Sequence, residues 1–567
     1  MSLATEANKY RSNLGKKVKL QQFNAEDTKQ MSVQVNSEAN TESQASFYSD
    51  MMSSFMVSSL SIEEQPTLIM PAIQDLKKIT ASQAGTAGYA NQLRTLIKSS
   101  GIYALASLAS PLVSLVLAPF LTRNLSHEDY GALAVITTTV ALVAGLTQLG
   151  LGSAFFRSYN YDYESPRDRL GVLSTVVILL ALVSLPIILA IILTAPYLAI
   201  LLLRNSSFSD VIRLGALVVL MQNLTVPGFA WLRAENRAGF FTMLSITNLL
   251  VNLGTTLVLV GILHMGMAGS LIGTGSGFAV VAICTLPLIL LRAGIDLRFD
   301  IARGLLSFGL PNASTFVSMW VLQLSDRYLL SFFGSLAQTA SYAVAYSLGG
   351  ILNVVILAPF TLAWPSAMFS IAKREDAPRI FRLVFLWYSI VLLFVAFALS
   401  LASMIMLYLF FPPTYRSAAF IIPIIALSTL FYGIYNIFTI GISIKRKTWF
   451  VVVFTSASAL VNVGLNLVLI PHYGAMGAAM STLLAYTFLS MIAYIVNQRI
   501  YPIPFEISTF IIALVIGTGF YVGSSFLAQG RGTYETWSIF LCALVLYGAC
   551  LLLLGILSTR RDNNISR

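Results

Sequence analysis

The chain has 567 residues, of which 57% are hydrophobic and only 10% are charged. A soluble domain carries about 25% charged residues, so this composition excludes an ordinary soluble protein and indicates an all-α protein that spans a membrane many times. The formal net charge is +11. Its basic residues are spread singly over many loops with no aromatic-interleaved patch, so we expect no nucleic-acid partner.

Residues 1–95 differ in composition from the rest of the chain. They are rich in Ser, Gln, Asn, Thr and Ala, and Lys16, Lys17 and Lys19 lie near the start. No apolar core follows these early basic residues, so the sequence shows no signal peptide. We expect a disordered cytoplasmic tail.

Beyond this tail, long apolar runs alternate with short polar loops. Each run is long enough to cross a bilayer as a helix, which is the structure that lipid requires of a lone span. The sequence predicts fourteen such helices, at about 101–122, 130–153, 170–194, 211–231, 241–262, 267–291, 304–332, 339–364, 382–411, 418–441, 448–470, 476–497, 508–528 and 536–557.

The loops predict the orientation of these helices. Most Lys and Arg residues follow even-numbered helices, whereas the loops after odd-numbered helices contain only Arg123, Arg204, Arg416 and Arg531. Cytoplasmic loops carry the excess of basic residues. We therefore expect both termini to be cytoplasmic, in agreement with an even number of helices.

An acid and a base stand side by side within the seventh predicted helix. Asp326 and Arg327 lie near the outer end of a run that is otherwise uncharged from Gly304 onward. Each such charge costs roughly 2.5–3.5 kcal/mol to insert, so an intramembrane ionisable residue is a functional-site hypothesis. The alternative is that the two charges neutralise each other or cap the helix at the interface.

Two segments of the chain resemble each other, 237–269 and 447–477. Phe240, Asn252 and Gly254 align in register with Phe450, Asn462 and Gly464. A shift of six helices preserves orientation, so the sequence predicts two parallel pseudo-symmetric six-helix lobes around a central cavity, as in one class of secondary transporters. The predicted parts are the tail 1–95, an N-lobe 96–292 with helices 1–6, a C-lobe 293–500 with helices 7–12, and a segment 501–567 with two extra helices and a short cytoplasmic tail.

Three stretches in this order resemble a known family. SDRYLLSFFGS at 325–335, followed by ASYAVAYSLGG at 340–350, resembles the seventh and eighth helices of Wzx-type polysaccharide flippases, which also handle O-antigen. LAPFLTRNLSHEDYGALAV at 117–135 resembles their first two helices, and the Asn, Pro and Gly pattern at 462–477 resembles the eleventh and twelfth. The resemblance covers about 96–500 and indicates the multidrug/oligosaccharidyl-lipid/polysaccharide exporter superfamily.

The resemblance implies export of an undecaprenyl-pyrophosphate-linked oligosaccharide across the bacterial inner membrane by alternating access, for surface polysaccharide such as O-antigen or exopolysaccharide. The expected partners are this lipid-linked substrate, membrane lipids, and a polysaccharide polymerase with its chain-length regulator. The planar guanidinium of Arg suits a pyrophosphate, because it can donate two parallel hydrogen bonds. The expected substrate-binding residues are Arg327, Asp326, Arg157, Arg123, Gln323 and Gln148.

Each of these residues also has a structural interpretation. Arg157 can be a positive-inside anchor, and Arg123 can extend from an interface towards water. Polar residues such as Gln148 and Gln323 can make interhelical hydrogen bonds, the interpretation that we favour for Asn252 and Asn462.

Two other functions stay open from the sequence. One is a MATE-like cation-coupled antiporter of drugs or metabolites, which would favour a carboxylate in the first helix, where 101–122 has none. The other is a membrane polymerase or ligase of lipid-linked sugars, which would favour a large outer loop, and every predicted outer loop is short. We expect a protein that is not an enzyme, without cofactor or metal, because the three cysteines and three histidines are scattered.

Overall fold

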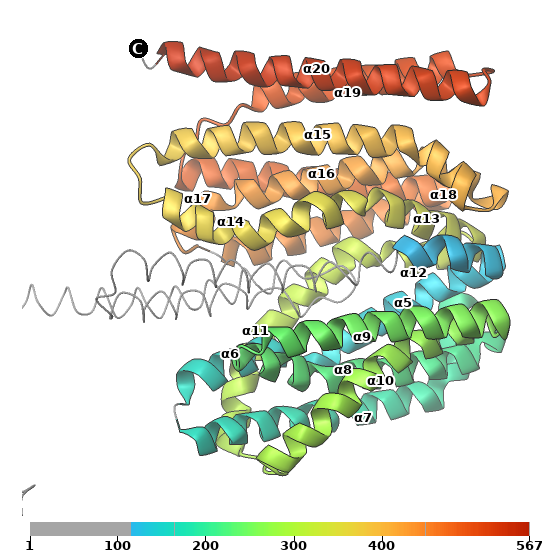
Figure 1. Ribbon diagram of the computed structural model, residues 1–567, viewed down its shortest axis with the longest axis vertical. Coiled ribbons are helices and arrows are strands. Elements are labelled where there is room, and N and C mark those ends of the chain that lie inside the picture. Colours follow the sequence, from blue (N-terminus) through green and yellow to red (C-terminus); the bar gives the residue numbers. More distant parts are fainter. Residues whose placement is uncertain (1–114, 164, 448, 566–567) are drawn as a thin grey trace, which may run out of the picture. The chain divides into compact units, whose positions relative to one another are not determined.

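The computed structural model describes residues 115–163, 165–447 and 449–565. Every regular element in these ranges is a helix (Figure 1), and they contain no strand. Residues 115–124 are helical and form the end of the first predicted helix. The predicted tail and the start of that helix lie outside the described residues.

After the helical residues 115–124, the first half of the described chain forms six α-helices with three short turns of other helix types. They are α5 (His127–Gln148), α6 (Leu151–Arg157), η3 (Ser158–Asp162), α7 (Pro166–Leu203), η4 (Ser206–Phe208), α8 (Ser209–Ala234), α9 (Ala238–Thr256), η5 (Leu257–Ile262) and α10 (Gly266–Ala293).

The second half continues with ten α-helices and two turns. They are α11 (Phe299–Leu324), α12 (Asp326–Phe333), α13 (Leu336–Gly349), η6 (Asn353–Leu357), α14 (Ala358–Ile371), α15 (Ala377–Phe410), η7 (Pro413–Phe420), α16 (Ile422–Phe438), α17 (Ile440–Ile444), α18 (Trp449–Ile500), α19 (Ile507–Ala528) and α20 (Thr533–Ile565).

Among the described residues, eleven helical stretches are long and apolar enough to span a membrane. One of them, α18, runs for 52 residues but is interrupted at Gly474, whose φ of 56° and ψ of −131° are not helical. The two arms of α18 correspond to the predicted helices 448–470 and 476–497. These observations confirm the predicted all-α polytopic membrane fold, and they are compatible with the predicted fourteen helices.

Small residues let helices of the first half approach closely. A Cβ atom at Gly228 of α8 would lie 2.3 Å from Oγ1 of Thr285 of α10, so no larger residue fits without a shift. Lipid offers no hydrophobic drive for helix association, and close contact through small residues replaces it. Nearby, Asn223 Nδ2 donates hydrogen bonds to Thr147 Oγ1 at 2.7 Å and to Ser184 Oγ at 2.8 Å, which join α8 to α5 and α7.

Aromatic side chains fill the core of the second half. The ring of Phe385 on α15 lies 5.5 Å from Phe438 of α16 and 5.1 Å from Phe505, which precedes α19. The last two helices, α19 and α20, pack against each other and against α15 (Figure 1). The C-terminal helix pair is therefore part of the same packed core as α15 and α16.

The predicted seventh helix, 304–332, is divided into α11 and α12 at Ser325. The hydroxyl of Ser325 donates to the carbonyl of Val321 at 2.6 Å, a local bond that often bends helices. The preceding helix, α11, contacts α5, α6 and α7 of the first half and α18 of the second. The boundaries of the two lobes stay predictions.

Candidate functional site

The predicted charge pair opens helix α12. Asp326 is its first residue and Arg327 its second, directly after the break at Ser325. Asp326 is 1% exposed and Arg327 is 6% exposed, so both charges are withdrawn from solvent and from lipid. A buried charge is tolerated only when neighbouring groups compensate it, and the surroundings of the pair supply several such groups.

Tyr342 of the neighbouring helix α13 donates its hydroxyl to Oδ2 of Asp326. The Thr482 hydroxyl of α18 is a further neighbour of this carboxylate. Arg327 approaches the other oxygen, Oδ1, with Nη1 at 3.8 Å, which is an ion pair and is longer than a hydrogen bond. The carboxylate is therefore held more firmly by α13 than by the arginine beside it.

The guanidinium of Arg327 faces aromatic and backbone groups. Its central carbon lies 4.6 Å from the ring centroid of Tyr346 on α13, the geometry of a cation–π contact. Its Nη1 lies 3.5 Å from the backbone oxygen of Gln323. The side-chain oxygen of Gln323 is buried and has no hydrogen-bond partner in the described part of the chain. Among the contacts described, the donors of Arg327 are therefore only partly used, and the side-chain oxygen of Gln323, four residues earlier, is an unused acceptor.

Further tyrosines extend this polar region into the second half. The ring of Tyr432 on α16 lies 5.3 Å from that of Tyr486 on α18, and Tyr486 in turn interacts with Tyr346. A tyrosine presents an apolar ring and a hydroxyl together. The charge pair thus lies beside a group of tyrosines from three different helices.

Sequence reasoning missed these tyrosines as site residues. A weak signal is present in the sequence, since Tyr130 and Tyr342 occupy similar positions at the starts of the second and eighth predicted helices. In the structure both lie near the pair, since Tyr342 binds Asp326 and the charge of Arg327 acts on Tyr130. Their importance could have been suspected from the repeat, whereas their partners could not.

The structure does not bring Arg157 to the charge pair. Arg157 ends α6, where its Nε lies 3.7 Å from Oδ1 of Asp162 and its side chain is 39% exposed. Its guanidinium carbon lies 4.9 Å from the ring of Phe308 on α11. Gln148, the last residue of α5, is buried. Both residues belong to the end of α5 and α6 that the basic loops mark as the inner one.

Arg123 lies at the opposite end. It is exposed, and it donates from Nε to the carbonyl of Phe410 at 3.1 Å and from Nη2 to the carbonyl of Leu409 at 3.0 Å. Helices α5 and α6 lie between Arg123 and Arg157, and at 1.5 Å per residue they separate the two arginines by about 40 Å. One head group therefore cannot contact both at once.

The repeat-related asparagines make contacts within their own helices. Oδ1 of Asn252 accepts from Thr256 Oγ1 at 3.2 Å, and Asn466 Nδ2 donates to Asn462 Oδ1 at 3.0 Å. A Cβ atom at Gly277 of α10 would lie 3.1 Å from that of Asn252. Both hydrogen bonds lie within a single helix, so the interhelical hydrogen bonds expected for Asn252 and Asn462 are not among the contacts described.

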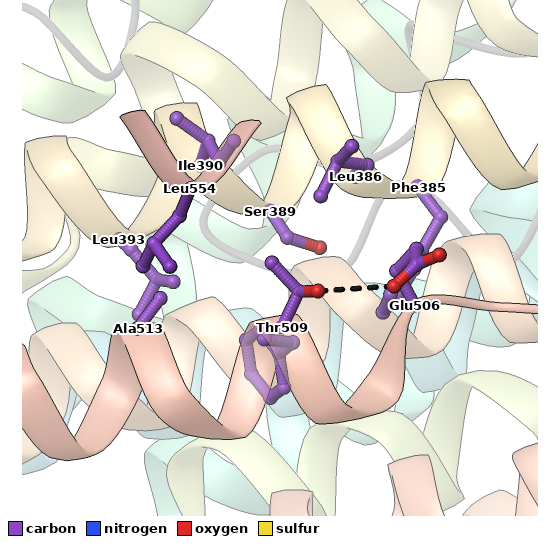
Figure 2. A pocket seen from close by; sticks show the side chains of 10 residues that line it. Phe385, Leu386, Ser389, Ile390, Leu393, Glu506, Thr509, Ala513 and Leu554 are labelled. Carbon is purple, nitrogen blue, oxygen red and sulfur yellow. Dashed lines mark hydrogen bonds between the residues drawn. The ribbon is translucent and has the colours of Figure 1, made fainter. Parts of the chain in front are cut away.

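A small pocket lies between α15, α19 and α20, away from the charge pair. Figure 2 shows mostly apolar side chains around it, with Ser389, Thr509 and Glu506 as the polar ones. Thr509 Oγ1 donates to Glu506 Oε2 at 3.0 Å, and Glu506 also forms an ion pair with Arg382 of α15. None of the six predicted site residues lines this pocket. The Arg382–Glu506 pair, which sequence analysis did not find, ties α19 to α15.

Among the residues that the structure describes, no three His, Cys, Asp or Glu side chains gather as metal ligands would. At the end of the molecule that has most of the basic loops, the hydrogen bond with Asp168 raises the pKa of Arg298, whose Nη1 lies 2.6 Å from Oδ1 of that carboxylate. This pair joins the start of α7 to the segment that precedes α11. The Arg298–Asp168 pair therefore serves packing.

Comparisons with known proteins found one matching family model and solved structures of similar fold. Residues 96–371 match the family model described as "Polysaccharide biosynthesis protein". A comparison with curated protein sequences found no match. Lipid II flippase MurJ, in an inward closed conformation, superposes with a TM-score of 0.60 at 18% identity, covering 81% of this chain and 99% of that chain. An inward-facing multidrug resistance transporter of the MATE family and MOP superfamily superposes with a TM-score of 0.51 at 16% identity, covering 70% of this chain and 93% of that chain. At such identities the likeness is one of fold.

Proposed function

We infer that this protein is a member of the multidrug/oligosaccharidyl-lipid/polysaccharide exporter superfamily, because residues 96–371 match the family model described as "Polysaccharide biosynthesis protein" and the fold resembles that of Lipid II flippase MurJ. We propose that it is a flippase that moves an undecaprenyl-pyrophosphate-linked oligosaccharide across the bacterial inner membrane during surface polysaccharide biosynthesis. It works by alternating access between the two predicted lobes, with both termini in the cytoplasm. A polysaccharide polymerase and its chain-length regulator act on the exported product.

The observation that carries this proposal beyond the family is the buried pair at the start of α12. A lipid-linked sugar pyrophosphate combines anionic oxygens with many hydroxyls. Arg327 offers guanidinium donors for the anionic oxygens. The unused oxygen of Gln323 and the ring of Tyr346 offer an acceptor and an apolar face for a sugar.

Binding requires the pair to rearrange, because both side chains are buried in this structure. The long 3.8 Å contact between Arg327 and Asp326 is the weaker of the two contacts made by the carboxylate. On this proposal Arg327 turns from Asp326 to the pyrophosphate, while Tyr342 keeps the carboxylate in place. The half-exposed Arg157 receives the head group first, at the inner end. Gln148 lies on the path from Arg157 to Arg327.

The test uses export of surface polysaccharide from a deletion strain that carries variants of the gene. Loss of the protein should remove the polymer and leave unpolymerised lipid-linked units on the cytoplasmic side. Arg327→Ala should fail to restore export while the protein still reaches the membrane, and Arg327→Lys should restore it partly. Arg416→Ala is the matched control, because Arg416 is exposed and contacts only the ring of Tyr408 among the contacts described. Full export with Arg327→Ala would remove this residue from the site.

A second candidate is a cation-coupled antiporter of drugs or metabolites. The shared fold with a MATE family transporter and the buried carboxylate of Asp326 favour it. It predicts unchanged polysaccharide in the deletion strain and raised sensitivity to cationic drugs. The same strain therefore discriminates the two functions.

A further inference from the structure

A set of contacts joins the two predicted lobes at the end of the molecule that has few basic loops. On the N-lobe side they come from residues 115–124 and from the start of α5, and on the C-lobe side from α13, from η7 and from the end of α15. We call this set the outer seam. It contains Arg123, His127 and Gly131 on one side and Leu336, Ser341, Tyr415 and the carbonyls of Leu409 and Phe410 on the other.

Arg123 spans the seam and caps a helix of the other side. The last four carbonyl groups of an α-helix have no partner within the helix, and they form the negative end of its dipole. Arg123 donates to two of these groups at the end of α15, Leu409 at 3.0 Å and Phe410 at 3.1 Å. Positive charge and hydrogen bonding therefore both favour the closed contact.

The backbones of α5 and α13 touch directly in the seam. A Cβ atom at Gly131 would lie 1.9 Å from the carbonyl oxygen of Leu336, so any residue with a side chain would force the two apart. Around this contact, buried apolar side chains of both sides, among them Leu125, Tyr130 and Tyr415, form one cluster, and polar contacts add to it. His127 Nε2 lies 3.1 Å from Ser341 Oγ, and the ring of Tyr415 meets the His127 ring edge-on at 4.4 Å.

We propose that the outer seam is a gate and that Arg123 is its lock, a positioning residue that does not bind substrate. The proposal rests on the transport function proposed above, since a transporter that alternates must part these contacts to release its substrate outside. The two hydrogen bonds of Arg123 add to the apolar packing of the closed seam, and because they lie at an exposed site, water can replace them when the seam opens. Arg123 thereby leaves the set of predicted substrate ligands.

The test measures the width of the seam directly, in the full chain reconstituted in lipid nanodiscs without substrate. Cys284, Cys542 and Cys550 are first replaced by Ser, and spin labels are attached to Glu128→Cys and Thr414→Cys, which are exposed on opposite sides. Double electron–electron resonance then gives the distribution of distances between the two spin labels. The parent protein should show one short distance.

Arg123→Gln should add a longer distance and raise the ratio of open to closed protein about tenfold or more, because hydrogen bonds to a charged group are lost. Gly131→Val should act as a wedge and shift most of the protein to the longer distance. Arg416→Ala removes another exposed arginine at the same end. Because Arg416 lies over the ring of Tyr408 on its own side of the seam, this variant should leave the distances unchanged.

The proposal is overturned if Arg123→Gln gives the parent distribution, or if Arg416→Ala shifts it as far. Gly131→Val keeps the gate itself testable if the Arg123 variant does not assemble, and an unchanged distance in this variant would refute the seam as a movable contact. Because the distances are measured without substrate, they are independent of the export assay. If the distances change as expected but the protein exports no polysaccharide, the role proposed for Arg123 stands and only the proposed substrate is rejected.

Discussion

Replacing Arg327 with methionine should destabilise the protein by about 3–5 kcal/mol, because it leaves the carboxylate of Asp326 buried without its ion-pair partner. Asp326 is 1% exposed and cannot regain water without local unfolding. Tyr342 would keep one oxygen bonded, whereas the other oxygen meets Arg327 at 3.8 Å. The lost electrostatic stabilisation therefore concerns mainly Oδ1 of Asp326, the oxygen that faces Arg327.

Removing both charges should cost much less. In Asp326→Asn with Arg327→Met, the amide can still accept from Tyr342, and no charge is left buried. Replacing both members of a buried pair by neutral groups is often close to neutral in stability. We expect a cost of about 1 kcal/mol, so the two substitutions should be non-additive by at least about 2 kcal/mol.

The assay is reversible unfolding in mixed micelles, followed by tryptophan fluorescence. Trp320 is well placed to report, since its ring lies 5.6 Å from that of Tyr328, next to Arg327. Arg416→Met serves as an exposed control and should stay within about 0.5 kcal/mol of the parent. A single Arg327→Met variant within about 1 kcal/mol of the parent, or a double variant less stable than the single one, would refute the argument.

Three further predictions test the packing in the same assay or by hydrogen exchange. Asn223→Leu removes two interhelical hydrogen bonds and should cost about 1 kcal/mol of unfolding free energy; an unchanged midpoint would contradict this. Gly228→Val should cost about 1–3 kcal/mol through overpacking against Thr285, and Thr285→Ala should recover part of the loss; if it recovers none, the clash lies elsewhere. Glu506→Gln should lower the exchange protection of α19 by about 1–2 kcal/mol, since it weakens the partly buried pair with Arg382; equal protection would show that apolar packing alone holds α19.

The spans were predictable because lipid imposes a simple rule on composition. The predicted helix 508–528 is Ile507–Ala528 in the structure, and the predicted 382–411 is Ala377–Phe410. The ends were less predictable. Helix α7 begins at Pro166, four residues before the prediction, because its first turn is polar and extends beyond the apolar run.

The contacts of the site were not predictable in the same way. Hydropathy identified Asp326 and Arg327 as unusual, but it could not select Tyr342, sixteen residues away on another helix, as the partner of the carboxylate. Arg123 was noticed as a cation near a helix end. Its partners are backbone carbonyls, which leave no mark in a sequence, so its role across the seam required coordinates.

The ion pair between Arg382 and Glu506 sets an order for biosynthesis. Its members lie 124 residues apart. At about 5–20 residues per second the ribosome needs roughly 6–25 s between them. During that interval α15 is already made while the pair cannot yet form, and the aromatic face around Phe385 lacks the α19 side of its packing. The C-terminal helices therefore complete the membrane core late in synthesis, and a chain truncated before residue 506 should be a target for membrane quality control.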